Sequence, residues 1–396
     1  MLLLNAIFLT ITLYCLLGAL YYFAAALLFL LAPGIRNNNP DQQRTDRHNR
    51  FLILIPAHNE EKVLPRLLDS VRQIEYPGNS FHCCVVCDNC EDGTERVAKA
   101  KGVTVLRRND KKRRGKGYAI EWALARMNIR DFDAVLMTDA DTMLDKDILK
   151  QLDMKFACHD VGAVQCYNGV INPDDTPFTR LISLARAMEI IYMASRSYLG
   201  LTVHLIGNGM CFRSSLLKTY PWTAFSLSED LEYFCLLSLK GVRVHYSYTA
   251  KVFLQEEEKL SDAKTQRQRW SSGRFPLIMR YVPGILWKWL KDRKAGKAEA
   301  AMILLVPNPS LLGNLLVAAL IFSLFLNLWR FIYLLNFISL FSLFFLFISS
   351  FLIVKMDRRR IFSVLLVPVY LVWKGVIDLQ AVFGKRKVQW IKTERH

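Results

Sequence analysis

The chain has long apolar runs near both ends and a patterned, mixed stretch between them. Residues 1–32 are almost wholly apolar, and Pro33 and Gly34 end the run. Because about 20 apolar residues cross a bilayer as a helix, we predict one transmembrane helix over 1–32. No Lys or Arg precedes the run, and it is too long for the apolar part of a cleaved signal peptide. A polar linker is expected over 33–50.

From residue 51 onward, short apolar runs alternate with stretches of helical spacing. The apolar runs predict buried strands over 51–57, 81–88, 103–108 and 134–141. Strands that alternate with helices of about 10 to 15 residues are typical of a mostly parallel sheet with helices on both faces. We therefore predict an α/β fold for a polar domain spanning 51–274.

The remaining third of the chain predicts further contact with a membrane. Residues 275–300 combine apolar and Trp residues with a Lys/Arg cluster, as an interfacial segment does. Residues 301–354 hold two long apolar runs and predict a transmembrane hairpin. Residues 355–396 predict an amphipathic or re-entrant helix and a basic tail. Lys374 and Asp378 interrupt the apolar pattern there, so we favour that interpretation over a further span.

Charge agrees with a membrane protein whose polar domain is cytoplasmic. The chain has 52 Lys and Arg against 35 Asp and Glu, a net charge of +17. The basic residues gather beside apolar segments, which favours an anionic membrane face over nucleic acid as the partner. Arg36, Arg44, Arg47 and Arg50 follow the first apolar run, so we expect a multi-pass protein of the cell membrane with its N-terminus outside. Nine Cys without a secretory spacing pattern indicate a reducing compartment.

Carboxylates follow two of the predicted strands. Asp88 ends the run 81–88, and Asp139 and Asp141 end the run 134–141. Open α/β sheets bind their ligands at the carboxyl ends of strands. Two carboxylates one residue apart can present oxygens to a hard cation that neutralises a diphosphate. The alternatives are a solvated turn for the aspartate pair and a helix cap for Asp88, a role that Asp92 offers as well.

Two further motifs carry cations and an aromatic ring. Lys116 lies in a basic, glycine-bearing loop at the start of a predicted helix, where phosphate is attracted; the alternative is a solvated run of charge. Gln266, Arg269 and Trp270 share one face of a helix. Arg suits a diphosphate, and Trp suits stacking on a sugar or nucleoside. An interfacial helix is the alternative for this second motif.

A zinc site is a competing interpretation of one cysteine-rich strand. The ligands would come from His82, Cys83, Cys84, Cys87 and Cys90. However, Cys84 and Cys87 are three positions apart on a strand and so point to opposite faces. No second Cys pair completes a tetrahedral site. We therefore expect small, buried apolar side chains rather than ligands.

The order of these motifs resembles one enzyme family. Asp88, the Asp139-Ala140-Asp141 motif, Ser228-Glu229-Asp230 and the Q-x-x-R-W motif ending at Trp270 occur as in the inverting, membrane-embedded family 2 glycosyltransferases. The layout is similar to the cellulose, hyaluronan and poly-N-acetylglucosamine synthases over nearly the whole chain. The resemblance implies a GT-A-type nucleotide-sugar-binding domain with transmembrane and interfacial helices.

The resemblance also implies a role for each motif. Asp230 would be the general base, although Ser228-Glu229-Asp230 also fits an ordinary capped helix. Asp141 and Asp139 would bind Mg²⁺ or Mn²⁺, and Asp139 would also contact the nucleotide. The remaining substrate-binding residues would be Pro56 and Glu60 of a P-x-x-N-E turn, Asp88, Lys116, Gln266, Arg269 and Trp270.

The implied reaction moves a sugar from a nucleotide donor, expected to be a UDP-sugar, to an acceptor hydroxyl. The expected product is an extracellular or cell-wall polysaccharide with β linkages. Two alternatives stay open. One is a single transfer to a lipid acceptor, and the other is a catalytically inactive membrane scaffold. The expected partners are the donor, a glycan or lipid acceptor and membrane lipids, with no nucleic acid.

Overall fold

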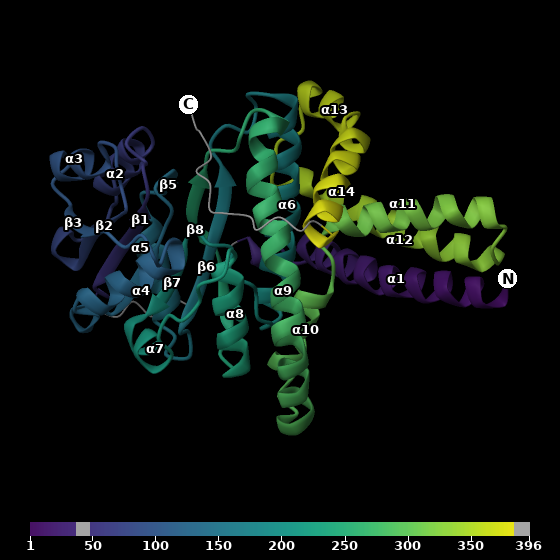
Figure 1. The fold of residues 1–396 in the computed structure, drawn as a ribbon, viewed down its shortest axis with the longest axis horizontal. Coiled ribbons are helices and arrows are strands. Elements are labelled where there is room, and N and C mark those ends of the chain that lie inside the picture. Colours follow the sequence, from purple (N-terminus) through teal and green to yellow (C-terminus); the bar gives the residue numbers. More distant parts are fainter. Residues whose placement is uncertain (37–47, 384–396) are drawn as a thin grey trace.

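The computed structural model of this chain describes residues 1–36 and 48–383, without the side chains of Asp262, Val382 and Phe383. The basic tail after residue 383 lies outside the described residues, as do Arg44 and Arg47 of the expected linker. Within this part of the chain, the structure consists of a layered α/β domain and a group of long helices that project from it (Figure 1).

One mixed sheet forms the centre of the α/β domain. Its strand order is β3-β2-β1-β4-β7-β6-β8-β5. Strands β1, β2, β3 and β4 are mutually parallel, β6 is parallel to β8, and the pairs β4–β7, β6–β7 and β5–β8 are antiparallel. The predicted mostly parallel sheet is therefore confirmed. The strands are β1 (Phe51–Ala57), β2 (Phe81–Asp88), β3 (Thr104–Arg108), β4 (Ala134–Met137), β5 (Thr142–Leu144), β6 (Ala163–Val170), β7 (Met210–Arg213) and β8 (Val244–Leu254).

The strand order creates a switch point between β1 and β4. The chain runs outward from β1 through β2 to β3 and then returns to the other side of β1 as β4. Connections leave β1 and β4 in opposite directions, so a crevice opens at their carboxyl ends, where doubly wound sheets bind ligands. The aspartate motifs of the sequence follow β2 and β4, on either side of this crevice.

Helices cover both faces of the sheet, as predicted. Along β2, Cys84 and Val86 belong to the core on one face, and Val85 and Cys87 belong to the core on the other. Both faces are apolar because each is buried under helices. The helices of the domain are α2 (Leu64–Arg72), α3 (Thr94–Ala100), α4 (Lys116–Arg126), α5 (Ile148–Phe156), α6 (Pro177–Tyr198), α7 (Ser214–Thr219) and α8 (Glu229–Leu239), with short 3₁₀ turns at Pro33–Ile35, Gly78–Ser80, Ile129–Asp131 and Ser350–Leu352 (η4).

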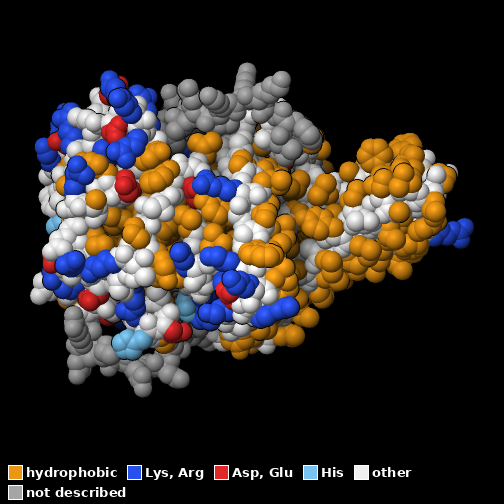
Figure 2. All heavy atoms as spheres, turned by 60° about the horizontal axis from the view of Figure 1, so that its bottom comes forward, with side chains coloured by type: hydrophobic (Ala, Val, Ile, Leu, Met, Phe, Trp, Pro, Cys, Tyr) orange, Lys and Arg blue, Asp and Glu red, His pale blue; other side chains and the backbone are white. Residues whose placement is uncertain are grey.

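Three described helices are long and apolar enough to cross a membrane. They are α1 (Leu2–Leu31), α11 (Pro309–Leu326) and α12 (Arg330–Ser349), the last continued by η4. A fourth crossing would count if α13 (Arg358–Val364) and α14 (Val367–Phe383) formed one span, but the two are bent by 52°. The three long helices lie side by side and project from the domain (Figure 1), and apolar side chains cover their surface (Figure 2).

One long helix connects the α/β domain to these projecting helices. Helix α9 (Leu260–Asp292) carries the Q-x-x-R-W motif near its start and continues without a break past residue 274, through the segment expected at the interface. Helix α10 (Ala295–Leu305) follows it. Arg274 donates hydrogen bonds to the carbonyls of Ile303, Leu304 and Val306. These carbonyls at the end of α10 have no partner within the helix, so Arg274 ties α9 to the point where α11 begins.

Candidate active site

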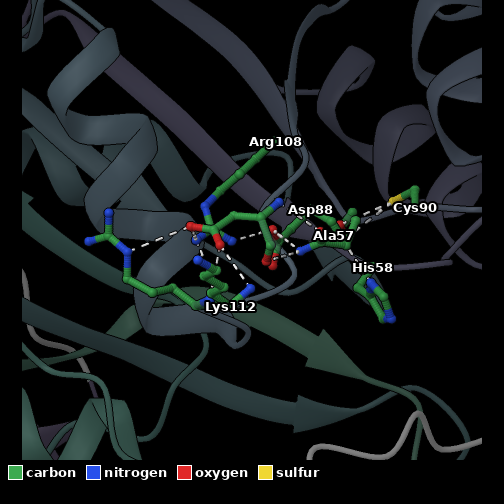
Figure 3. Close-up of polar contacts among 9 residues, drawn as sticks. Ala57, His58, Asp88, Cys90, Arg108 and Lys112 are labelled. Carbon is green, nitrogen blue, oxygen red and sulfur yellow. Dashed lines mark hydrogen bonds and ion pairs between the residues drawn. The ribbon is translucent and has the colours of Figure 1, made fainter.

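Asp88 lies in a buried ion pair at the edge of the crevice. Parallel pairing places Asp88 opposite Arg108 of β3, and Arg108 Nη1 lies 2.6 Å from Asp88 Oδ1. Both side chains are buried, and Figure 3 shows Arg108 reaching toward Asp88. Burial raises the pKa of Asp88, and the neighbouring guanidinium opposes that rise. Arg108 was not predicted from the sequence, although its position at the end of the neighbouring strand was a usable signal.

The turn after β1 is tied to the loop that follows Asp88. His58 Nδ1 lies 2.7 Å from the Asp88 carbonyl oxygen, and Asn59 Oδ1 accepts a hydrogen bond from the Glu91 N–H. The backbone N–H of Glu60 donates to Thr94 Oγ1 at 2.8 Å. Pro56 lies in the same segment, as the next-to-last residue of β1. The structure therefore brings the predicted P-x-x-N-E turn next to Asp88, as a nucleotide site would require.

Neither Asp88 nor Asp92 is the N-cap of the helix that follows, because Gly93 occupies that position. Asp92 Oδ1 accepts a hydrogen bond from the Thr94 N–H at 2.9 Å, at the start of α3. The carboxylate of Asp88 is engaged by Arg108 and by the side chain of Asn89. The capping alternative for Asp88 is therefore wrong.

A buried asparagine anchors the Asp139–Asp141 turn. Asn208 Oδ1 accepts hydrogen bonds from the Asp139 N–H at 3.1 Å and from the hydroxyls of Thr138 and Thr142. Asn208 lies between Gly207 and Gly209, which both have positive φ angles of 78° and 65°. We assigned no role to this Gly-Asn-Gly segment from the sequence. A polar residue between two glycines marks a tight backbone turn and was a signal that could have identified it.

Lys116 connects the two acidic motifs of the site. Its ammonium lies 2.5 Å from Asp139 Oδ1 and 3.5 Å from Glu229 Oε1, and it donates to the carbonyl of Gly207. Burial disfavours its charge, but Asp139 and Glu229 outweigh that effect and raise the pKa of Lys116. The side chain is only 16% exposed. The alternative of a solvated charge run is therefore wrong for Lys116.

Asp230 lies in the first turn of α8, close to Lys116. Its Oδ1 accepts a hydrogen bond from the Leu231 N–H at 2.7 Å. A methyl group added to Gly207 would lie 3.0 Å from Asp230 Oδ2, so the Gly207 backbone closes over this carboxylate. Burial and the neighbouring Glu229 raise the pKa of Asp230 to about 7. Ser228 occupies the N-cap position, but its side chain accepts no helix N–H, contrary to the capped-helix alternative.

Helix α9 packs its backbone against the same acidic turn. A methyl group added to Gly273 would overlap Ser228 Oγ, so the α9 backbone lies directly against the Ser228 side chain. Gln266 is buried on this helix, and Arg269 and Trp270 are partly buried one turn later. Among the described residues, Arg269 Nε is buried without a hydrogen-bond partner. The Q-x-x-R-W motif therefore belongs to the helix that adjoins Asp230.

Two arginines flank the indole of Trp270. The guanidinium carbons of Arg267 and Arg186 lie 4.6 Å and 5.7 Å from its ring centroid. Glu256 pairs with both arginines, with N–O distances of 2.9 Å to Arg267 and 3.0 Å to Arg186. Burial acts against the charge of Glu256, yet the two cations lower its pKa. The sequence did not predict Arg186 or Glu256, because their partners are distant along the chain.

Asp139 and Asp141 suit a divalent cation only if the substrate supplies further ligands. Across residues 1–36 and 48–383, no group of three or more His, Cys, Asp or Glu side chains is placed to hold a metal ion. Mg²⁺ is commonly bound by one or two carboxylates together with substrate phosphates and water, so this donor set fits that ion. The competing zinc ligands Cys84 and Cys87 belong to cores on opposite faces of the sheet, as expected.

Comparison with curated proteins identifies several similar enzymes. A beta-monoglucosyldiacylglycerol synthase of Trichormus variabilis is 26% identical over 251 residues, covering 61% of this chain and 52% of that protein. A probable glycosyltransferase of Bacillus subtilis, YdaM, is 24% identical over 87% of this chain and 86% of its own. A poly-beta-1,6-N-acetyl-D-glucosamine synthase of Staphylococcus aureus is 24% identical over 66% and 64%. This chain spans about half the length of the first of these relatives.

The fold and the sequence profile agree with these similarities. The solved structure of the mannosyltransferase PcManGT from Pyrobaculum calidifontis, in complex with GDP-Man and Mn²⁺, matches 95% of this chain and 100% of its own. The TM-score is 0.55 at 18% identity, which confirms the predicted GT-A-type fold. The sequence profile described as glycosyltransferase like family 2 matches residues 48–273. The chain therefore belongs to the family 2 glycosyltransferases.

Proposed function

We propose that this protein is a membrane-bound, inverting glycosyltransferase that moves a sugar from a nucleotide donor to an acceptor hydroxyl. The observation that carries the proposal is the link through Lys116 between Asp139, after β4, and the turn that holds Asp230. It joins Asp139, at the switch point of the sheet, to Asp230, a partly buried carboxylate with a raised pKa. The three apolar helices support the membrane-bound part.

The donor would bind along the edge formed by β2, β1 and β4. Asp88, positioned by Arg108, would accept hydrogen bonds from the base or ribose of a UDP-sugar, next to Pro56 and Glu60. Asp139 and Asp141 would hold Mg²⁺ or Mn²⁺, which supplies positive charge to the departing diphosphate when it is bound. If Asp139 binds the metal and releases Lys116, the ammonium of Lys116 would lie close to the phosphates of the donor.

Asp230 would remove the proton of the acceptor hydroxyl. An inverting transfer needs one base, placed on the face of the sugar opposite the leaving group. The oxygen of the acceptor hydroxyl would form a bond to the anomeric carbon while the bond between that carbon and the diphosphate breaks. The hydroxyl proton would pass to the carboxylate of Asp230. Lys116 would keep enough of the Asp230 population ionised, because its charge lowers the pKa that burial raises.

Trp270, Gln266 and Arg269 would line the acceptor side. An indole stacks on sugar rings, and the free N–H of Arg269 can donate to a diphosphate or an acceptor oxygen. We propose a β-linked polysaccharide as the product. A single transfer to a lipid is the second candidate, because within the described part of the chain three helices, or four with the bent pair, suit a membrane crossing. An inactive scaffold has no support, since every motif carboxylate is present.

A donor screen with the full chain in lipid bilayers tests this function. We expect sugar transfer that requires Mg²⁺ or Mn²⁺ from one of a panel of nucleotide sugars. Polymer growth without added lipid acceptor supports the polysaccharide, and a single sugar on a lipid supports the second candidate. Asp230→Asn should reduce transfer by about 10²- to 10⁴-fold while donor binding persists. Asp69→Asn, a partly exposed carboxylate paired with Lys101, is the matched control. Full activity in Asp230→Asn would contradict the assignment of the base.

A further inference from the structure

A cavity of about 210 Å³ opens beside the acceptor side of the candidate site. It lies between α6, the carboxyl ends of β6 and β8, and the segment 353–355, which follows η4. A cavity of this size is smaller than the pockets that hold drug-sized ligands, so it suits a headgroup and the first carbons attached to it. Its apolar wall consists of Tyr167, Val170, Ile190, Phe253, Ile353 and Val354.

The segment 353–355 places the cavity at the level of the membrane surface. The candidate span Arg330–Leu352 ends directly before Ile353. The next residues, Lys355 to Arg360, include four Lys or Arg, the composition of a cytoplasmic boundary. A lipid of the inner leaflet could therefore reach the cavity without leaving the bilayer.

Two structural features connect the wall of the cavity with the candidate active site: the paired strands of the sheet and the side chain of Arg186. Val170 of β6 pairs with Leu254 of β8, and Leu254 pairs with Thr142, the residue after Asp141. Adjacent strands lie about 4.8 Å apart, so two strand spacings separate the cavity wall from the aspartate turn. Arg186 lines the cavity and also contacts the Trp270 ring.

Three cations line the cavity, and their charges are unequally compensated. Arg186 pairs with Glu256 and Glu189, and Arg360 pairs with Asp174 and Asp357. The third cation is exposed Lys355, which forms no ion pair within the described part of the chain. Arg360 is buried, and among the described residues its Nε has no hydrogen-bond partner. The cavity therefore retains one uncompensated positive charge and one buried donor.

We propose that this cavity binds the phosphate headgroup of an anionic glycerophospholipid. Lys355 supplies the free charge, Arg360 supplies the buried N–H donor, and the apolar wall takes the glycerol and the first carbons of the chains. The proposal rests on the membrane location proposed above, but not on the identity of the acceptor. The bound lipid lies next to Trp270, so it would complete the wall of the acceptor side.

The test measures lipid binding by the full chain in nanodiscs of phosphatidylcholine with increasing phosphatidylglycerol. Native mass spectrometry after transfer to detergent counts the retained phosphatidylglycerol. Lys355→Ala should weaken retention about fivefold, the worth of one basic residue at a membrane surface. Val354→Phe, which fills the cavity without changing charge, should weaken it as well. Arg359→Ala removes the same charge from an exposed residue outside the cavity and should leave retention unchanged.

The outcomes separate the possible explanations. Equal losses in Lys355→Ala and Arg359→Ala would show general surface attraction and overturn the cavity. Unchanged retention in Val354→Phe would also overturn it. Displacement of the lipid by millimolar inorganic phosphate would identify a free-phosphate site instead. Nucleotide binding is measured on the same samples, so a failure of the proposed glycosyltransferase function is seen independently of lipid retention.

Discussion

Lys116 Nζ lies 2.5 Å from Asp139 Oδ1, and this contact joins the donor side of the site to its acidic helix. The same ammonium lies 3.5 Å from Glu229, the residue before Asp230. One partly buried cation therefore faces three carboxylates from two separate motifs. The electrostatics of the proposed base thus depend on a residue more than a hundred positions earlier in the sequence.

The first prediction concerns pH. The proposed base acts only when ionised, and burial raises the pKa of Asp230 to about 7, so kcat/KM should fall as pH drops through about 7. The Lys116 charge lowers that pKa. In Lys116→Met the acid limb should therefore move to higher pH, in addition to any loss of rate. A pH–rate profile of both proteins checks this, and an unmoved limb in the variant would contradict the coupling.

The second prediction compares two glycines with the same backbone strain. Gly207 and Gly241 have φ angles of 78° and 76°, so Ala at either position should cost about 1 to 2 kcal/mol of unfolding free energy. A methyl group on Gly207 would press on Asp230 Oδ2 at 3.0 Å, whereas nothing lies within 4 Å of one on Gly241. Gly207→Ala should lose transfer activity more than tenfold, since about 1.4 kcal/mol of barrier is tenfold in rate.

Gly241→Ala is the control in this comparison and should keep wild-type kcat/KM. Chemical denaturation measures stability, and the donor screen measures activity. Equal activity in the two variants would mean that the Gly207 backbone does not limit the position of Asp230.

The third prediction tests the contact between α9 and the acidic turn. Ala is favoured over Gly inside a helix by about 1 kcal/mol, so Gly284→Ala on α9 should stabilise the protein. Its new methyl group would meet only Leu239 at an ordinary 3.8 Å. Gly273→Ala would instead overlap Ser228 and should destabilise the protein and reduce activity. Thermal unfolding of both variants in the same bilayer checks the opposite signs.

The fourth prediction concerns the support of Trp270. Glu256→Gln keeps a hydrogen-bond acceptor but leaves the charges of Arg186 and Arg267 without their shared carboxylate. Loss of a charged hydrogen-bond partner costs about 1 to 3 kcal/mol. We expect this cost to appear chiefly as a higher KM for the acceptor, with donor binding unchanged. Glu258→Gln, two residues later and exposed, is the control. A loss of donor affinity equal to the loss of acceptor affinity would contradict a role on the acceptor side.

The first half of the sheet was predictable because its strands are local and continuous apolar runs. The run 51–57 is strand β1 and the run 81–88 is strand β2, with Asp88 at its end. The predicted strand 134–141 ends earlier, at Met137, because Asn208 turns the backbone at Thr138 and Asp139. The position of the aspartate turn was therefore correct, whereas its anchor depends on a residue about 70 positions away.

The second half of the site depended on long-range contacts that periodicity does not report. Strands β6, β7 and β8 pair in mixed directions, and their order follows from packing across the sheet. Glu256 precedes a predicted helix and has the appearance of a surface residue in an acidic run. Its burial arises because Arg186 of α6 and Arg267 of α9 meet there. Such charge pairs become visible only when the fold places distant helices together.

The hydrogen bonds from Arg274 to the end of α10 have a mechanical consequence. Arg274 is four residues after Trp270 on α9, so the two side chains lie one helical turn apart on the same face. The end of α10, which precedes α11, and the ring proposed to hold the acceptor are thus both attached to one turn of α9. In the membrane arrangement proposed above, a tilt of α11 would be transmitted to Trp270 through α10 and Arg274. The orientation of the proposed acceptor ring is therefore tied to that of the candidate spans, and not to the α/β domain alone.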